Sequence, residues 1–84
     1  MPTIRVTTTF TVRSPFGDPD DVTLEPSTGE AENVDAAADA MASAIRNLLV
    51  SAVWLSLGLG GGIQQIIRAS DVLGVEVQAE EVEA

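Results

Sequence analysis

The chain of 84 residues contains no cysteine, histidine or tyrosine, and its four basic residues are all arginine. Without cysteine it forms no disulfide, and without cysteine and histidine it lacks the usual ligands of zinc. The side chains that most often act as nucleophiles or general bases are therefore scarce. We expect a protein that is not an enzyme and that binds no cofactor and no metal.

Positive charge is also scarce, because 13 acidic residues face four arginines and the formal net charge is −9. Such a chain has no basic surface that displaces counterions from phosphates, so we expect no nucleic-acid partner. An acidic, lysine-free composition is typical of halophilic proteins, because high ionic strength screens the repulsion between their carboxylates. An ordinary acidic protein from a GC-rich host is the alternative interpretation.

The N-terminal segment lacks the apolar core of a signal peptide, so nothing in it indicates secretion by that route. The composition is that of a globular chain, and the length predicts a single domain over residues 1–84 with an acidic, frayed tail at 79–84. A chain of this size hides roughly 60% of its unfolded surface on folding, which allows one thin core.

Several segments alternate apolar and polar residues with the period of a β-strand. In residues 3–13 the more apolar side comprises Ile4, Val6, Thr8, Phe10 and Val12. This pattern predicts a long, half-buried strand with a threonine-rich edge that another chain could extend. Residues 21–25 predict a short second strand and residues 75–78 a later one, while 63–73 fit either a short helix or a strand.

A helix is predicted to begin at Asn33, whose side chain is a good N-cap, and to run to Leu57. Its core stripe comprises Val34, Ala38, Met41, Ile45, Leu48, Leu49 and Ala52. The glycines of residues 58–62 are expected to end this helix. The sequence thus predicts a small α+β domain of order β-β-α-β, with one long helix packed on a short, mostly antiparallel sheet.

The outer face of the expected helix changes from polar to apolar toward its end, where it carries Val50, Trp54 and Leu57. Leaving three such side chains in water forgoes roughly 1.5–3 kcal/mol each, a large part of the stability of a small domain. We therefore predict that Val50, Trp54 and Leu57 form an interface with another subunit or partner. The alternative is that residues 63–78 of the same chain cover them.

These observations favour a structural or assembly subunit that forms a homo-oligomer or docks into a multi-copy complex, such as a virion capsid or tail. Residues 47–67 carry no charge and match the length that spans a bilayer, so a small membrane protein is a second hypothesis. Two glutamines, an asparagine and several glycines within that segment argue against insertion. A monomeric binding or regulatory module, with the Trp54 side receiving a peptide or ligand, is the third hypothesis.

Two further segments resemble ligand-binding loops only in part. The glycines of residues 58–62 follow an expected helix and have no lysine beside them, unlike a phosphate-binding loop. Residues 18–21, with Glu25, gather carboxylates but lack the ordered ligands of a calcium loop. We interpret the first segment as a helix stop and the second as a solvated turn.

Overall fold

The computed structural model describes residues 1–14 and 16–82 of the chain. Its strands are β1 (Thr3–Val12), β2 (Asp20–Thr23), β3 (Ser27–Glu30), β4 (Trp54–Gly60), β5 (Ile63–Arg68) and β6 (Val72–Val82). Its helices are α1 (Val34–Ser51) and η1 (Ala69–Asp71), a single 3-10 turn. The α+β class is confirmed, with one α-helix and antiparallel sheets, whereas six described strands replace the three of the predicted β-β-α-β order.

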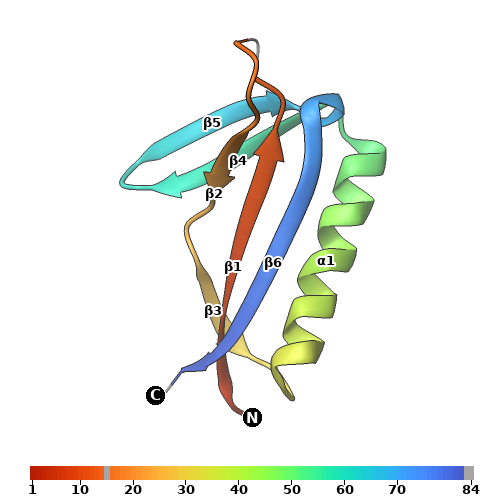
Figure 1. The fold of residues 1–84 in the computed structure, drawn as a ribbon. Coiled ribbons are helices and arrows are strands. Elements are labelled where there is room, and N and C mark those ends of the chain that lie inside the picture. Colours follow the sequence, from red (N-terminus) through yellow and green to blue (C-terminus); the bar gives the residue numbers. More distant parts are fainter. Residues whose placement is uncertain (15, 83–84) are drawn as a thin grey trace.

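Strand β1 is the centre of the main sheet (Figure 1). Along one edge, β2 pairs with its C-terminal half and β3 with its N-terminal half, while β6 runs along the whole of the other edge. All three pairings are antiparallel. The threonine-rich strand therefore has no open edge along most of its length, contrary to the expectation from the sequence. The outer edges of the sheet belong to β6 on one side and to the short strands β2 and β3 on the other.

The alternation of β1 is confirmed by burial, because the residues of its predicted inner side are all buried. These residues are Ile4, Val6, Thr8, Phe10 and Val12. The opposite face of the sheet is polar, and its neighbouring strands are joined through side chains: Thr11 donates to Asp21 at 2.9 Å, and Arg5 binds Glu80 at 3.0 Å. One face of the sheet thus builds the core and the other faces solvent.

Helix α1 begins as predicted, because the Asn33 side-chain oxygen accepts a hydrogen bond from the Ala36 N–H at 2.8 Å. The helix packs against β6 and β1 along the inner side of the sheet (Figure 1). It ends at Ser51, so the predicted extension to Leu57 is wrong. Beyond Ser51 the residues alternate in burial with a period of two, and this part of the chain pairs as a strand.

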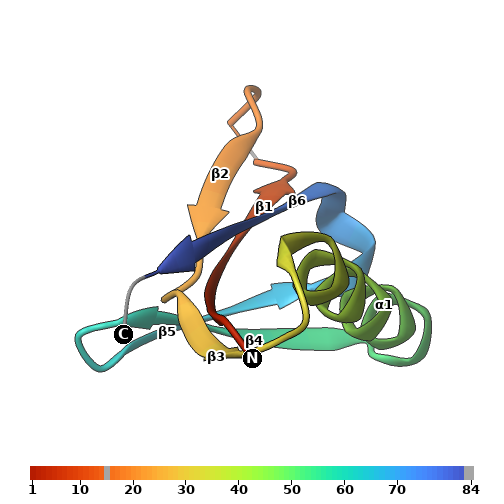
Figure 2. The ribbon, with the colours of Figure 1, turned by 90° about the horizontal axis from the view of Figure 1, so that it is seen from below.

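Strands β4 and β5 form a separate antiparallel hairpin that crosses the inner side of the main sheet and is seen at the bottom of the view in Figure 2. Its turn uses Gly60, Gly61 and Gly62, whose φ angles of 85°, 62° and 78° strongly favour glycine. The predicted helix stop is therefore a hairpin turn. A hydrogen bond of 3.0 Å from the Glu25 N–H to the Gly58 carbonyl ties the hairpin to the segment after β2.

The ambiguous segment 63–73 is strand β5, the 3-10 turn and the start of β6. Residues 27–30, for which the sequence analysis predicts no strand, pair with β1 as a short exposed strand. Residues 79–82, assigned to an acidic tail from the sequence, are the last part of β6, and residues 83–84 lie outside the described residues.

The core lies where sheet, helix and hairpin meet. Its buried members are Phe10, Val12, Val22, Ile45, Leu55 and Leu57. Phe10 and Leu55 are each 2% exposed, so β1 and β4 provide the most deeply buried side chains of this group. The long helix contributes a single fully buried residue, Ile45, and its remaining apolar side chains stay partly accessible. A core this small leaves apolar surface elsewhere on the molecule.

Candidate interaction surface

The structure separates the three residues that the sequence grouped on one helical face. Val50 lies on the last turn of α1 and is 88% exposed, and Trp54 begins β4 and is 58% exposed. Leu57 also lies on β4 but points inward and is 3% exposed. Leu57 is therefore a core residue, and the shared helical face does not exist because the helix ends before Trp54.

The register of β4 and β5 defines an outward side of this hairpin, which we call the hairpin face. The directly paired residues on this side are Trp54 with Arg68, Ser56 with Ile66, and Gly58 with Gln64. Residues in direct cross-strand pairs project to the same side of a sheet, and the alternate pair of Leu55 with Ile67 turns inward. The six residues of the hairpin face are all exposed.

Two large apolar side chains dominate the hairpin face. Trp54 and Ile66 are diagonal neighbours across the two strands, and Ile66 is 67% exposed. Val53, which precedes Trp54, is also exposed but is not part of the hairpin face. Ile66 escaped the sequence analysis, although the alternation that starts at Trp54 and the following glycine turn were signals of a hairpin.

The polar groups of the hairpin face are held close to its surface. The Arg68 guanidinium lies over the Trp54 ring, with its Cζ atom 5.3 Å from the ring centroid, a cation–π arrangement. Across the hairpin, the Ser56 hydroxyl donates to the Gln64 side-chain oxygen at 3.1 Å. These contacts restrict the side chains before any partner binds, which lowers the entropy lost on association.

Charge distinguishes the hairpin face from the rest of the molecule. It carries one arginine and no carboxylate, in a chain whose formal net charge is −9. Two acidic residues, Asp20 and Asp71, line a hollow of about 380 Å³ at the edge of this face, together with Trp54, Ile66 and Arg68. The six residues of the hairpin face thus carry a charge opposite in sign to that of the chain as a whole.

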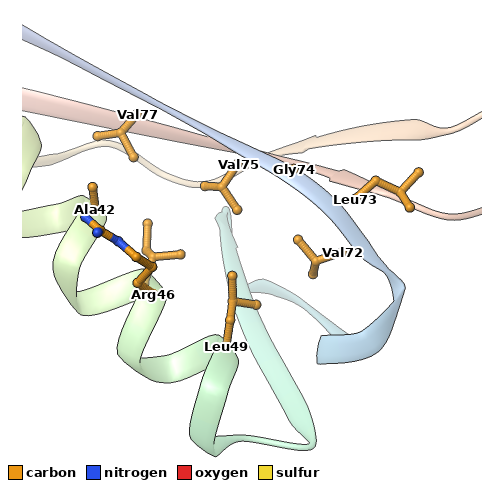
Figure 3. A pocket seen from close by; sticks show the side chains of 9 residues that line it. Ala42, Arg46, Leu49, Val72, Leu73, Gly74, Val75 and Val77 are labelled. Atoms are coloured by element: carbon orange, nitrogen blue, oxygen red, sulfur yellow. The ribbon is translucent and has the colours of Figure 1, made fainter.

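A second apolar feature is a groove of about 310 Å³ between α1 and β6 (Figure 3). The side chains that line it are Ala42, Ile45, Arg46, Leu49, Val72, Leu73, Val75 and Val77. In the close-up, Val72, Val75 and Leu49 point into the space between the strand and the helix. The groove runs beside the free edge of β6, a neighbourhood that the sequence did not reveal.

The acidic turn shows no gathering of ligands. Among residues 1–14 and 16–82, no three carboxylates converge as a protein-bound cation requires. One carboxylate of this turn, Asp21, accepts the Thr11 hydroxyl, and Asp20, Asp21 and Glu25 are all exposed. The carboxylates of Asp20, Asp21 and Glu25 are therefore accessible to solvent, and that of Asp21 is bonded to the neighbouring strand β1.

The uncharged segment 47–67 is divided between the end of α1, β4 and most of β5. Within the part of the chain that the structure describes, no helix is both long enough and apolar enough to cross a bilayer. Comparison of the chain with protein-family models, curated proteins and solved structures gave no match.

Proposed function

We propose that this protein is a non-enzymatic assembly subunit that self-associates into a multi-copy complex, with the hairpin face as a contact surface. The observation that carries this proposal is the exposed pair of Trp54 and Ile66 on a surface free of carboxylates. Tryptophan and arginine are enriched among the residues that dominate protein–protein binding, and here Arg68 and Trp54 are adjacent.

Burial of the apolar side chains at this surface favours association. Complete burial of a large apolar side chain contributes roughly 1.5–3 kcal/mol. Trp54 and Ile66 are each more than half exposed, so an interface gains about 1–2 kcal/mol from each. Two copies contribute the same residues to a symmetric contact, which doubles that gain. A modest patch can thus support a dimer or a larger symmetric complex.

Sedimentation velocity of the detergent-free protein tests the proposal. We expect an oligomer whose mass falls on dilution and that Trp54→Asp dissociates, because the substitution removes the largest apolar side chain of the contact and puts a carboxylate in its place. Helix content by circular dichroism should stay the same, since Trp54 is 58% exposed and lies outside the buried core.

The matched control is Phe16→Ser, which removes an exposed aromatic residue from the β1–β2 connection instead of the hairpin. This variant should sediment like the unsubstituted protein. A monomer at every concentration would contradict the proposal and favour a monomeric binding module. Recovery of the protein only in detergent would favour the membrane hypothesis instead.

A further inference from the structure

We propose that two copies of this chain pair antiparallel through the free edges of their β6 strands, continuing the main sheet across both. This inference rests on the proposed self-association but uses a surface separate from the hairpin face. Strand β6 pairs with β1 along one edge, and no other strand within residues 1–14 and 16–82 pairs with its second edge. At Val72–Val82, it is the longest strand of the protein.

The pairing of β1 with β2 shows which backbone N–H and carbonyl groups of β6 point toward its unpaired edge. The Thr8 carbonyl accepts the Leu24 N–H at 2.9 Å, so the backbone groups of Thr8 face β2 and not β6. Successive residues of a strand direct these groups to opposite sides, and Thr8 is paired with Val77. The N–H and carbonyl of Val77 therefore point away from β1, toward the open edge.

The same alternation extends along the strand. Val75, Val77, Ala79 and Glu81 direct their backbone groups outward, whereas Glu76, Gln78 and Glu80 bond to β1. An antiparallel strand placed at this edge finds a regular series of donors and acceptors, which is the basis of strand addition. The apolar groove beneath provides a surface for the inward side chains of both strands (Figure 3).

A second copy fits this edge in a register that separates the carboxylates. With Val77 opposite Val77 of the second copy, Val75 faces Ala79 and Glu76 faces Gln78. In the single chain, the Gln78 Nε2 already donates to the Glu76 carboxylate at 2.6 Å, so this pair is chemically compatible.

The same register places Glu80 opposite Gly74, which has no side chain and open space around its Cα. Glu80 already binds Arg5 at 3.0 Å in the same chain. No carboxylate of β6 is thus directly opposite another carboxylate in this dimer. Like charges in direct cross-strand positions destabilise a sheet, so their separation favours this arrangement.

The two neighbouring symmetric registers, centred on Gln78 and on Glu76, each place carboxylates directly opposite one another. If Gln78 faced Gln78 of the second copy, Glu76 would lie opposite Glu80, and both carboxylates would be on the same side of the sheet. If Glu76 faced itself, two carboxylates would meet at the two-fold axis. The Val77-centred register also keeps the bulge between β1 and β6, at Thr11 and Val12, outside the central pairs.

A chain without cysteine allows a clean test by disulfide formation. In the proposed dimer the two Val77 Cα atoms are about 5.5 Å apart, which lies within the span of a disulfide. Under mild oxidation, Val77→Cys should give a covalent dimer at least roughly tenfold faster than free collision, since pairing raises the local thiol concentration. Glu81→Cys is the matched control at the same edge, where the two thiols would be about 26 Å apart.

A proline substitution in β6 provides a second test of the pairing. Ala79→Pro removes an outward N–H and leaves the bonds between β6 and β1, so cross-linking of Val77→Cys should be lost while the far-ultraviolet spectrum is unchanged. Ala79→Ser, which keeps the N–H, should cross-link normally.

The two association surfaces separate in the Trp54→Asp background. Cross-linking at position 77 should persist there, even though assembly through the hairpin face is lost. If Val77→Cys stays monomeric while the protein sediments as an oligomer, the β6 pairing is refuted and the hairpin contact stands. Equal cross-linking of Val77→Cys and Glu81→Cys would also refute it, and a protein that is monomeric throughout would overturn both proposals.

Discussion

The Arg68 guanidinium lies over the Trp54 ring, its Cζ atom 5.3 Å from the ring centroid, and the two residues are direct cross-strand partners at the open end of the hairpin. This contact covers part of the largest apolar side chain that the protein exposes near the hairpin. It also places the only charge of the hairpin face beside its aromatic residue. Trp54 is also the single tryptophan of the chain, so its fluorescence reports on this contact alone.

Removing the cation should change the fluorescence of that indole. In Arg68→Ala, Trp54 loses a cation–π contact of about 0.5–1 kcal/mol and becomes more accessible, so we expect red-shifted emission and stronger acrylamide quenching. Measurements should be made at concentrations where the protein is dissociated. Arg68→Lys is the control: it keeps a cation beside the indole, so its emission and quenching should stay close to those of the unsubstituted protein. Identical quenching in all three proteins would show that the contact is not populated in solution.

A pair of substitutions tests the separation of Leu57 from Val50. Leu57 is 3% exposed and belongs to the core, so Leu57→Ala should lower the free energy of unfolding by about 2–5 kcal/mol. Val50 is 88% exposed, and Val50→Ala should change it by less than about 0.5 kcal/mol. Unfolding by denaturant, at a protein concentration low enough to keep the protein dissociated, measures the free energy of unfolding of both variants. Similar losses for the two variants would contradict the placement of Val50 at the surface.

The glycine turn offers a comparison between two nearby positions. Gly61 has a φ of 62°, which an alanine adopts only with strain of roughly 1 kcal/mol or more, so Gly61→Ala should destabilise the protein. Gly58 lies within β4, has no positive φ, and has open space for a methyl group. Gly58→Ala should therefore be neutral or slightly stabilising in the same thermal unfolding measurement. The reverse order would be inconsistent with a hairpin turn at residues 60–62.

Salt should stabilise the fold. The net charge is −9, and Arg5–Glu80 is the one ion pair among residues 1–14 and 16–82. Carboxylate repulsion therefore dominates, and it acts over about 10 Å at 0.1 M salt but only about 3 Å at 1 M. We expect the melting temperature to rise between dilute and molar sodium chloride. Equal melting temperatures would remove the halophilic interpretation of the composition.

The first strand and the start of the helix could be predicted because their signals are local. Alternation identified the inner side of β1, and Asn33 was recognisable as a cap. The end of the helix was missed because residues 48–57 are apolar enough to satisfy either period. Burial alternates from Trp54 onward, and the packing of Leu55 and Leu57 in the core makes the strand the better solution.

Other elements depend on distant partners and have little signal of their own. Strand β3 has the sequence Ser-Thr-Gly-Glu, without an apolar residue, and exists because β1 offers it a ladder. Of the three residues predicted as an interface, Val50 and Trp54 are exposed and Leu57 is buried, and only Trp54 lies on the hairpin face. Their role as an interface stays a prediction. Ile66 and Arg68 join Trp54 only through strand register, and register depends on where the turn falls.

The pairing of β1 with β6 joins Thr3 to Val82 and therefore connects segments from nearly opposite ends of the chain. The helix and the glycine hairpin involve neighbouring residues and can form early, but the longest ladder must wait until β6 has been synthesised. Contacts of such high sequence separation slow folding. Until that ladder closes, one edge of β1 keeps unpaired backbone groups that another chain could pair with, and the incompletely folded protein is at its most vulnerable to aggregation.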